Sequence, residues 1–128
     1  MPVNKEMSVL IVDDYQTMRS VIRNLLNKLG FEHTLEAGTT DEAMAVLNEK
    51  KCDLVIFDWL TGPMPGADFM KTVRADEKLS NLPFIVICAE SNRELTDSLK
   101  QAGVSDFMAK PFTEAMLKKR LVALFGSF

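Results

Sequence analysis

The sequence predicts an α/β fold, a doubly wound parallel sheet of five strands with helices on both faces. Short apolar runs alternate with segments of helical periodicity, and this alternation recurs five times along the 128 residues. Strands that are continuously apolar are typical of a parallel sheet covered on both sides. We expect residues 1–128 to form a single stand-alone domain with a tail at 1–7, because this length can bury a sizeable core.

The strands are predicted at the apolar runs, which cover residues 9–12, 33–37, 54–57, 84–87 and 105–109. After the first run, apolar residues recur at helical spacing from Met18 to Leu29, and Gly30 stands where this helix should end. Thr40 is the expected N-cap of the second helix.

The third helix is predicted over about residues 67–75, after a loop rich in Gly and Pro at residues 61–66. The fourth helix is indicated by the spacing of Leu95 and Leu99, and the last helix is expected to begin after a cap at Thr113.

Composition excludes several classes of function. A net charge of −3 argues against non-specific binding to nucleic acid or to an anionic membrane. The longest apolar run, residues 84–89, is far too short to span a bilayer, and the polar first residues are unlike a signal peptide. We therefore expect a cytoplasmic protein. Two cysteines, Cys52 and Cys88, do not make a disulfide framework.

Ligands of such sheets bind beyond the carboxyl ends of the strands. Asp13 and Asp14 follow the first strand, and Asp58 follows the third. If these strands are neighbours, the acids converge, and their repulsion is relieved by a hard cation such as Mg²⁺. Taken singly, the acid pair is equally well explained as a solvated helix N-terminus, and Asp58 as a loop acid.

Lys110 follows the fifth strand and precedes Pro111, which favours an extended or cis geometry. A lysine at this edge is the natural ion partner of the acids, although most lysines are simply solvated. Together these residues suggest a carboxylate nucleophile, a shielding metal and a lysine that stabilises a transferred phosphoryl group.

The chain resembles bacterial response-regulator receiver domains, and among them the chemotaxis, CheY-like group. The resemblance rests on residues 9–14, the pair Asp58-Trp59, residues 71–76 and residues 101–112. It implies the strand order 2-1-3-4-5. It also implies phosphorylation of Asp58 by a histidine kinase.

By the same resemblance, Asp13 and Asp14 would bind Mg²⁺ together with Asp58 and the carbonyl of Leu60, and Lys110 would contact the phosphoryl group. The domain would act as a phosphoacceptor that catalyses its own phosphotransfer and dephosphorylation, rather than as an ordinary enzyme. The flagellar motor switch is the natural candidate for its protein partner.

The resemblance places a switch and partner surface on the fourth helix, fifth strand and fifth helix, and its predicted members are Cys88, Glu90, Phe107 and Lys118. Cys88 replaces the usual Thr or Ser, and a thiol is a weak hydrogen-bond donor. The loop at residues 61–66 also departs from the family pattern. The alternative is therefore a receiver-fold binding module whose switching is weakened or independent of phosphorylation.

Two other classes fit less well. A phosphatase of the haloacid dehalogenase type would want an acid two residues after its nucleophile, where this chain has Leu60. A flavin-binding protein would want a phosphate loop after the first strand, where Asp13 and Asp14 would repel phosphate.

Overall fold

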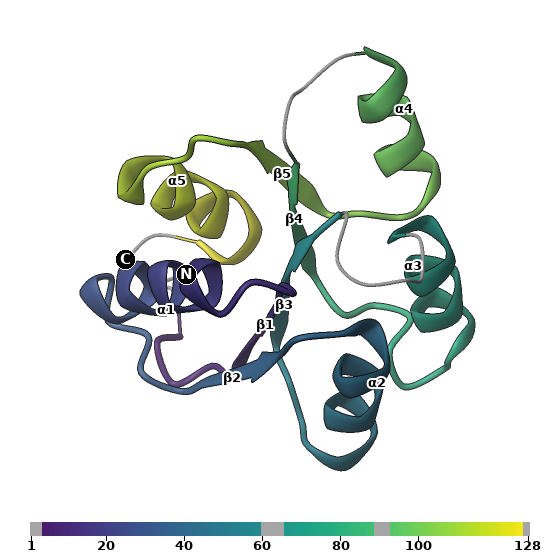
Figure 1. The fold of residues 1–128 in the computed structure, drawn as a ribbon, viewed down its shortest axis with the longest axis horizontal. Helices are drawn as coiled ribbons and strands as arrows, with labels where there is room; N and C mark the ends of the chain where they lie inside the picture. The colour runs from purple at the N-terminus through teal and green to yellow at the C-terminus, as the bar shows by residue number, and fades with distance from the viewer. Residues whose placement is uncertain (1–3, 60–65, 89–92, 127–128) are drawn as a thin grey trace.

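The protein is described here by a computed structural model, which covers residues 4–59, 66–88 and 93–126 and folds into three layers (Figure 1). The middle layer is a parallel sheet in the order β2-β1-β3-β4-β5, which confirms the predicted topology. The strands are β1 Val9–Val12, β2 Thr34–Ala37, β3 Leu54–Asp58, β4 Phe84–Cys88 and β5 Asp106–Ala109.

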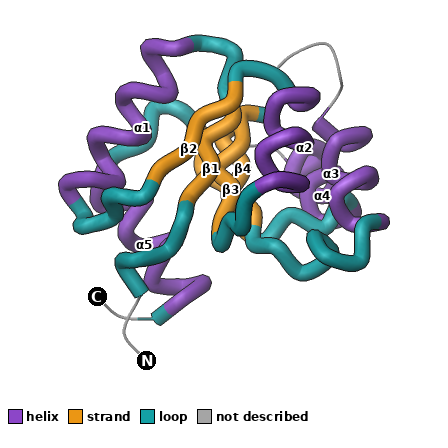
Figure 2. The backbone as a smooth tube through the Cα atoms, turned by 90° about the horizontal axis from the view of Figure 1, so that it is seen from below, coloured by secondary structure: helices purple, strands orange, loops and turns teal. Residues whose placement is uncertain are grey.

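The helices form the outer layers. Figure 2 shows α1 and α5 against one face of the sheet, and α2, α3 and α4 against the other. Their bounds are α1 Gln16–Lys28, α2 Thr40–Glu49, α3 Gly66–Ala75, α4 Arg93–Gln101 and α5 Glu114–Phe125. Every residue of β1, β3 and β4 is buried, as the continuous apolar runs predicted.

The sheet separates two hydrophobic cores. Successive side chains of a strand point to opposite faces. In β1, Leu10 and Val12 therefore belong to the core under α2, α3 and α4, whereas Val9 and Ile11 belong to the core under α1 and α5. Because both faces are covered, functional groups of the sheet lie at the ends of the strands.

The ends of three helices show how local sequence sets the boundaries. Gly30, just after α1, has φ 101°, a backbone conformation that suits glycine. Thr113 caps α5 as expected, because its hydroxyl accepts a hydrogen bond from the Met116 amide. The cap predicted at Thr40 is wrong by one residue. Thr39 is extended and accepts from the Glu42 amide, whereas Thr40 is already helical and buried.

Arg74 of α3 holds together the amino end of β4. Its guanidinium lies 5.3 Å from the centre of the Phe84 ring, and burial lowers its pKa. It donates hydrogen bonds to main-chain carbonyls on both sides of β4, those of Leu79, Ser80, Leu82 and Gly103. One side chain thus ties α3 to the loop before β4 and to the turn after α4.

Candidate phosphoacceptor site

The strand register brings the predicted residues to one edge of the sheet. β1 pairs with β3 so that Val12 lies beside Phe57, which sets Asp13 level with Asp58. β4 pairs with β5 so that Cys88 lies beside Ala109, and the Lys110 amide donates to the Cys88 carbonyl at 2.8 Å. The site is thus formed by residues at the carboxyl ends of four strands.

Lys110 and Asp58 form a partly buried ion pair. Lys110 Nζ lies 2.9 Å from Asp58 Oδ2, and Asp58 is 6% exposed. Burial lowers the pKa of the Lys110 ammonium, but the hydrogen bond and charge of Asp58, with the charges of Asp13 and Asp14, outweigh it and raise the pKa. The Lys110–Pro111 peptide is cis, one of the geometries expected from the sequence.

Asp13 and Asp14 lie in different environments. Asp13 is fully buried, and its Oδ1 accepts a hydrogen bond from the Tyr15 amide at 2.9 Å. Burial, and then the charge of Asp58, raise the pKa of Asp13 from 3.8 to about 6, against the Tyr15 hydrogen bond. Asp14 is exposed, and its charge acts on Lys110.

The donor set fits a hard divalent cation. Asp13 Oδ2 is buried and receives no hydrogen bond from any described residue, which is costly for a carboxylate unless a cation binds it. No group of three or more His, Cys, Asp or Glu side chains within residues 4–59, 66–88 and 93–126 is arranged to hold a metal. Main-chain carbonyls and water would therefore complete the coordination, as is usual for Mg²⁺.

Cys88 ends β4 beside this site. It is 3% exposed, and its thiol donates a weak hydrogen bond to the Met108 carbonyl, with Sγ 3.5 Å from the oxygen. Burial, and then the charge of Asp58, raise the pKa of the Cys88 thiol. The thiol hydrogen is therefore engaged with β5.

The predicted partner surface is partly described. Phe107 is half-buried and packs against the core under α2, α3 and α4, and Lys118 is exposed on α5. Leu60 and Glu90, and residues 61–65 of the predicted loop, lie outside the described residues.

Arg19 reaches the site without having been singled out by the sequence. Its Nη1 donates to the main-chain carbonyl of Asp13. The signal available in the sequence is weak, since it consists of a cation on α1 about one and a half turns after an acid pair.

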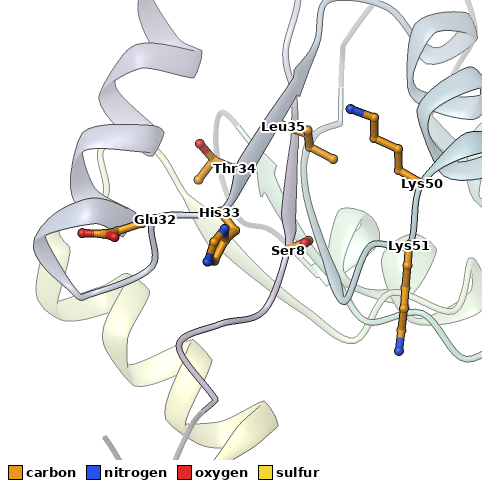
Figure 3. Close-up of a pocket in the computed structure, with 7 residues that line it drawn as sticks. All are labelled: Ser8, Glu32, His33, Thr34, Leu35, Lys50 and Lys51. Atoms are coloured by element: carbon orange, nitrogen blue, oxygen red, sulfur yellow. The ribbon is translucent and has the colours of Figure 1, made fainter.

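The opposite end of the sheet carries a hollow of ≈ 330 Å³, which Figure 3 shows with its lining residues. Lys50 and Lys51 both line it, but Lys50 extends toward Leu35 whereas Lys51 points the other way. His33 is paired with Glu6 at 2.9 Å. The cations do not converge on one point, so this hollow lacks the arrangement of an anion site.

Comparisons with known proteins agree with this geometry. Residues 9–122 match the family model of the response regulator receiver domain. Chemotaxis protein CheY-3 of Vibrio cholerae serotype O1 is 45% identical over 123 residues, which covers 96% of this chain and 95% of that protein. No helix in the described part of this chain is long and apolar enough to cross a membrane.

Solved structures give the same assignment. Chemotaxis response regulator CheY4 of Vibrio cholerae superposes with a TM-score of 0.86 at 28% identity, covering 94% of this chain and 99% of that one. The receiver domain of sensor histidine kinase PA1611 from Pseudomonas aeruginosa, with magnesium coordinated in its active site cleft, gives 0.84 at 25% identity, covering 95% and 99%. The chain therefore belongs to the response regulator receiver domain family, is homologous to the CheY chemotaxis regulators, and acts in two-component signal transduction.

Proposed function

We propose that Asp58 accepts a phosphoryl group from a histidine kinase in a Mg²⁺-dependent reaction, and that the phosphorylated domain binds a downstream chemotaxis protein. One observation carries the site assignment. The buried Asp58 carboxylate is paired with Lys110 and lies beside a second buried acid, Asp13, whose Oδ2 lacks a hydrogen bond among the described residues.

In this mechanism an oxygen of the ionised Asp58 attacks the phosphorus of a phosphohistidine. An O–P bond forms and the P–N bond to the histidine breaks, with the bonding electrons leaving on the imidazole, which then takes up a proton. No general base is needed, because a carboxylate nucleophile has no proton to give up. Lys110 stabilises the negative phosphoryl oxygens by moving its ammonium from Asp58 to them.

Asp13, Asp14 and Asp58 would hold Mg²⁺, one or two of them directly and the rest through water, with the carbonyl of Leu60 as a further ligand. When bound, the metal would neutralise the negative charge that develops on the phosphoryl oxygens. Receiver domains in general catalyse the transfer of the phosphoryl group to their own aspartate and the later hydrolysis of the aspartyl phosphate. In the proposed role this chain is the acceptor that is consumed and restored, not an enzyme acting on a separate substrate.

The proposed partners are a histidine kinase and, through Cys88, Glu90, Phe107 and Lys118, a downstream protein such as the flagellar motor switch. Homology to the CheY regulators supports a chemotaxis partner. The site would work in the cytoplasm, and neither nucleic acid nor a membrane is needed for it.

A second candidate function is favoured by Cys88. Its thiol donates to the Met108 carbonyl and is almost fully buried. A phosphoryl group on Asp58 would therefore meet a weak donor that is already engaged. In this alternative the domain binds its partner with little dependence on phosphorylation.

The site assignment is tested by intact mass after incubation with Mg²⁺ and acetyl phosphate. We expect a single phosphoryl adduct in the wild type and in Asp53→Asn, a variant at the other end of β3, and none in Asp58→Asn. An adduct on Asp58→Asn would overturn the assignment, and a wild type without an adduct would overturn the proposed function.

The two candidates are separated by partner binding. The first predicts that phosphorylation of the wild type strengthens binding to a motor-switch peptide. The second predicts equal binding with and without phosphoryl donor, and a phosphorylation dependence that appears in Cys88→Thr.

A further inference from the structure

Asp13 is held by hydrogen bonds on nearly all its polar atoms. Its amide donates to the Ala37 carbonyl at 3.1 Å, its Oδ1 accepts from the Tyr15 amide, and its carbonyl accepts from Arg19. Its Oδ2 is the buried oxygen that receives no hydrogen bond from the described residues. The main chain and one carboxylate oxygen are thus fixed, and the second oxygen is left for another ligand.

Arg19 is itself fixed by β2. Its Nε donates to Glu36 Oε1 at 3.1 Å, and its side chain is 17% exposed, so solvent screens this ion pair only in part. Gly38 lies close enough that a Cβ there would stand 3.3 Å from Arg19 Nη1 and 3.6 Å from Glu42 Oε2. The guanidinium therefore occupies a narrow space, in which its planar fork joins α1 to the start of the site.

Arg23 offers an internal comparison. Its Nη1 lies 3.0 Å from Glu36 Oε2, the other oxygen of the same carboxylate. The two arginines carry the same charge and share one partner, but it is Arg19 that donates a hydrogen bond to the Asp13 carbonyl. An effect that Arg19 exerts through its hydrogen bond to Asp13 is therefore not expected from Arg23.

We infer that Arg19 is a positioning residue of the cation site: anchored on Glu36, it fixes the main chain of Asp13 so that Oδ2 faces the metal. This inference rests on the proposed function, because it assumes that the cation binds Asp13. Residues that orient metal ligands from outside the coordination sphere commonly change metal affinity 10- to 100-fold when they are removed.

The sign of the effect distinguishes positioning from simple electrostatics. Removing a cation near the site should strengthen binding of a divalent metal if charge alone acts. Loss of a positioning contact should weaken it, because the free energy of ordering Asp13 must then be supplied by the metal. Arg19→Gln and Arg23→Gln remove the same charge from neighbouring positions of α1, so Arg23→Gln is the charge-matched control.

The test is titration of the protein with Mg²⁺, followed by the fluorescence of Trp59, which is adjacent to Asp58. We expect Arg19→Gln to weaken Mg²⁺ binding by roughly 10-fold, and Arg23→Gln to leave it unchanged or slightly stronger. Arg19→Lys should be intermediate, because an ammonium keeps the charge but lacks the separate nitrogens with which the planar guanidinium reaches Glu36 and Asp13 together. Equal weakening in both glutamine variants, or wild-type affinity in a folded Arg19→Gln, would overturn the inference.

A metal-free measurement separates this inference from the proposed function. Amide hydrogen exchange at Tyr15, whose amide donates to Asp13 Oδ1, should be faster in Arg19→Gln than in the wild type and unchanged in Arg23→Gln. If the wild type binds no Mg²⁺, the proposed function fails and the cation-site role of Arg19 fails with it, even where exchange shows that Arg19 orders Asp13. Unchanged exchange in Arg19→Gln overturns the positioning role.

Discussion

Asp53 and Arg74, near the amino ends of the strands, bind main-chain groups, whereas Asp58 and Lys110, at the carboxyl ends, bind one another. Before β3, Asp53 accepts the Ser8 amide at 2.9 Å, and beside β4 Arg74 binds several carbonyls. At the other end, Asp58 pairs with Lys110, and Asp13 Oδ2 lacks a hydrogen-bond donor among the described residues. The first arrangement is complete and serves stability, and the second becomes complete when a cation binds.

The largest expected effect is on the free energy of unfolding, and it tests the amino ends of the strands. In Arg74→Met the main-chain carbonyls that Arg74 binds, most of them partly buried, lose their donor, and we expect a loss of about 3 kcal/mol in the free energy of unfolding. Lys71→Met, which removes an exposed cation one turn earlier on α3, should change it little. Urea unfolding followed by Trp59 fluorescence measures both. Weaker Mg²⁺ binding by the folded Arg74→Met protein would contradict the separation of a stabilising amino end from a cation-binding carboxyl end.

The second expected effect is the pH dependence of stability without metal. Because the pKa of Asp13 is raised from 3.8 to about 6 in the folded protein, folding takes up a proton between these values. The contribution of Asp13 is full below its ordinary pKa and is lost as the pH rises through about 6. Its size is on the order of 3 kcal/mol.

This contribution is isolated by comparing thermal unfolding of the wild type and Asp13→Asn from about pH 4 to about pH 7. We expect the difference between them to grow with pH, with Asp13→Asn becoming relatively more stable. Asp53→Asn is the control at the other end and should not reproduce this trend. A parallel pH profile for wild type and Asp13→Asn would contradict the raised pKa of Asp13.

A smaller effect concerns competition for Asp58. The Lys110 ammonium repels an incoming divalent cation and occupies Asp58 Oδ2. We expect Lys110→Met to bind Mg²⁺ about 3- to 10-fold more tightly and to give less phosphoryl adduct, because a partner of the phosphoryl oxygens is missing. Lys119→Met, which removes an exposed cation from α5, is the control. Weaker Mg²⁺ binding by Lys110→Met would show that the lysine supports the cation site instead.

The smallest expected effect compares the two thiols. Cys52 near the amino end of β3 is half-buried, and Cys88 at the carboxyl end of β4 is 3% exposed. Burial raises the pKa of both, so both should react slowly with a disulfide reagent near pH 8. Cys52 should react several-fold faster because it is more accessible. Single Cys→Ala variants assign the two rates, and a faster Cys88 would mean that the carboxyl end opens readily.

The strands were predictable because burial on both faces leaves an unmistakable apolar run. β1 has the predicted bounds, and β3 and β4 extend one residue further, to Asp58 and Cys88. The cap of α2 was missed by one residue. Thr39 and Thr40 have the same side chain, and the choice between them depends on backbone geometry, which the residue types do not determine.

The site was predictable as a set of residues, not as an arrangement. Asp13 and Asp14 are adjacent in the sequence and were predicted as a pair, but Asp13 is fully buried and Asp14 is exposed. Arg19 was missed because its contact is to a main-chain carbonyl, and such a contact leaves no pattern in residue types. Both features follow from how α1 packs after β1, which is a tertiary effect.

The separation of the two cores by the sheet has a consequence for how substitutions combine. Val55 and Phe57 of β3 share one core, whereas Ile56 between them belongs to the other. Pairs of substitutions at Val55 and Phe57 should be non-additive, and pairs at Val55 and Ile56 should be closer to additive. Along a strand, therefore, epistasis should alternate from one position to the next, and adjacency in sequence should be a poor guide to energetic coupling.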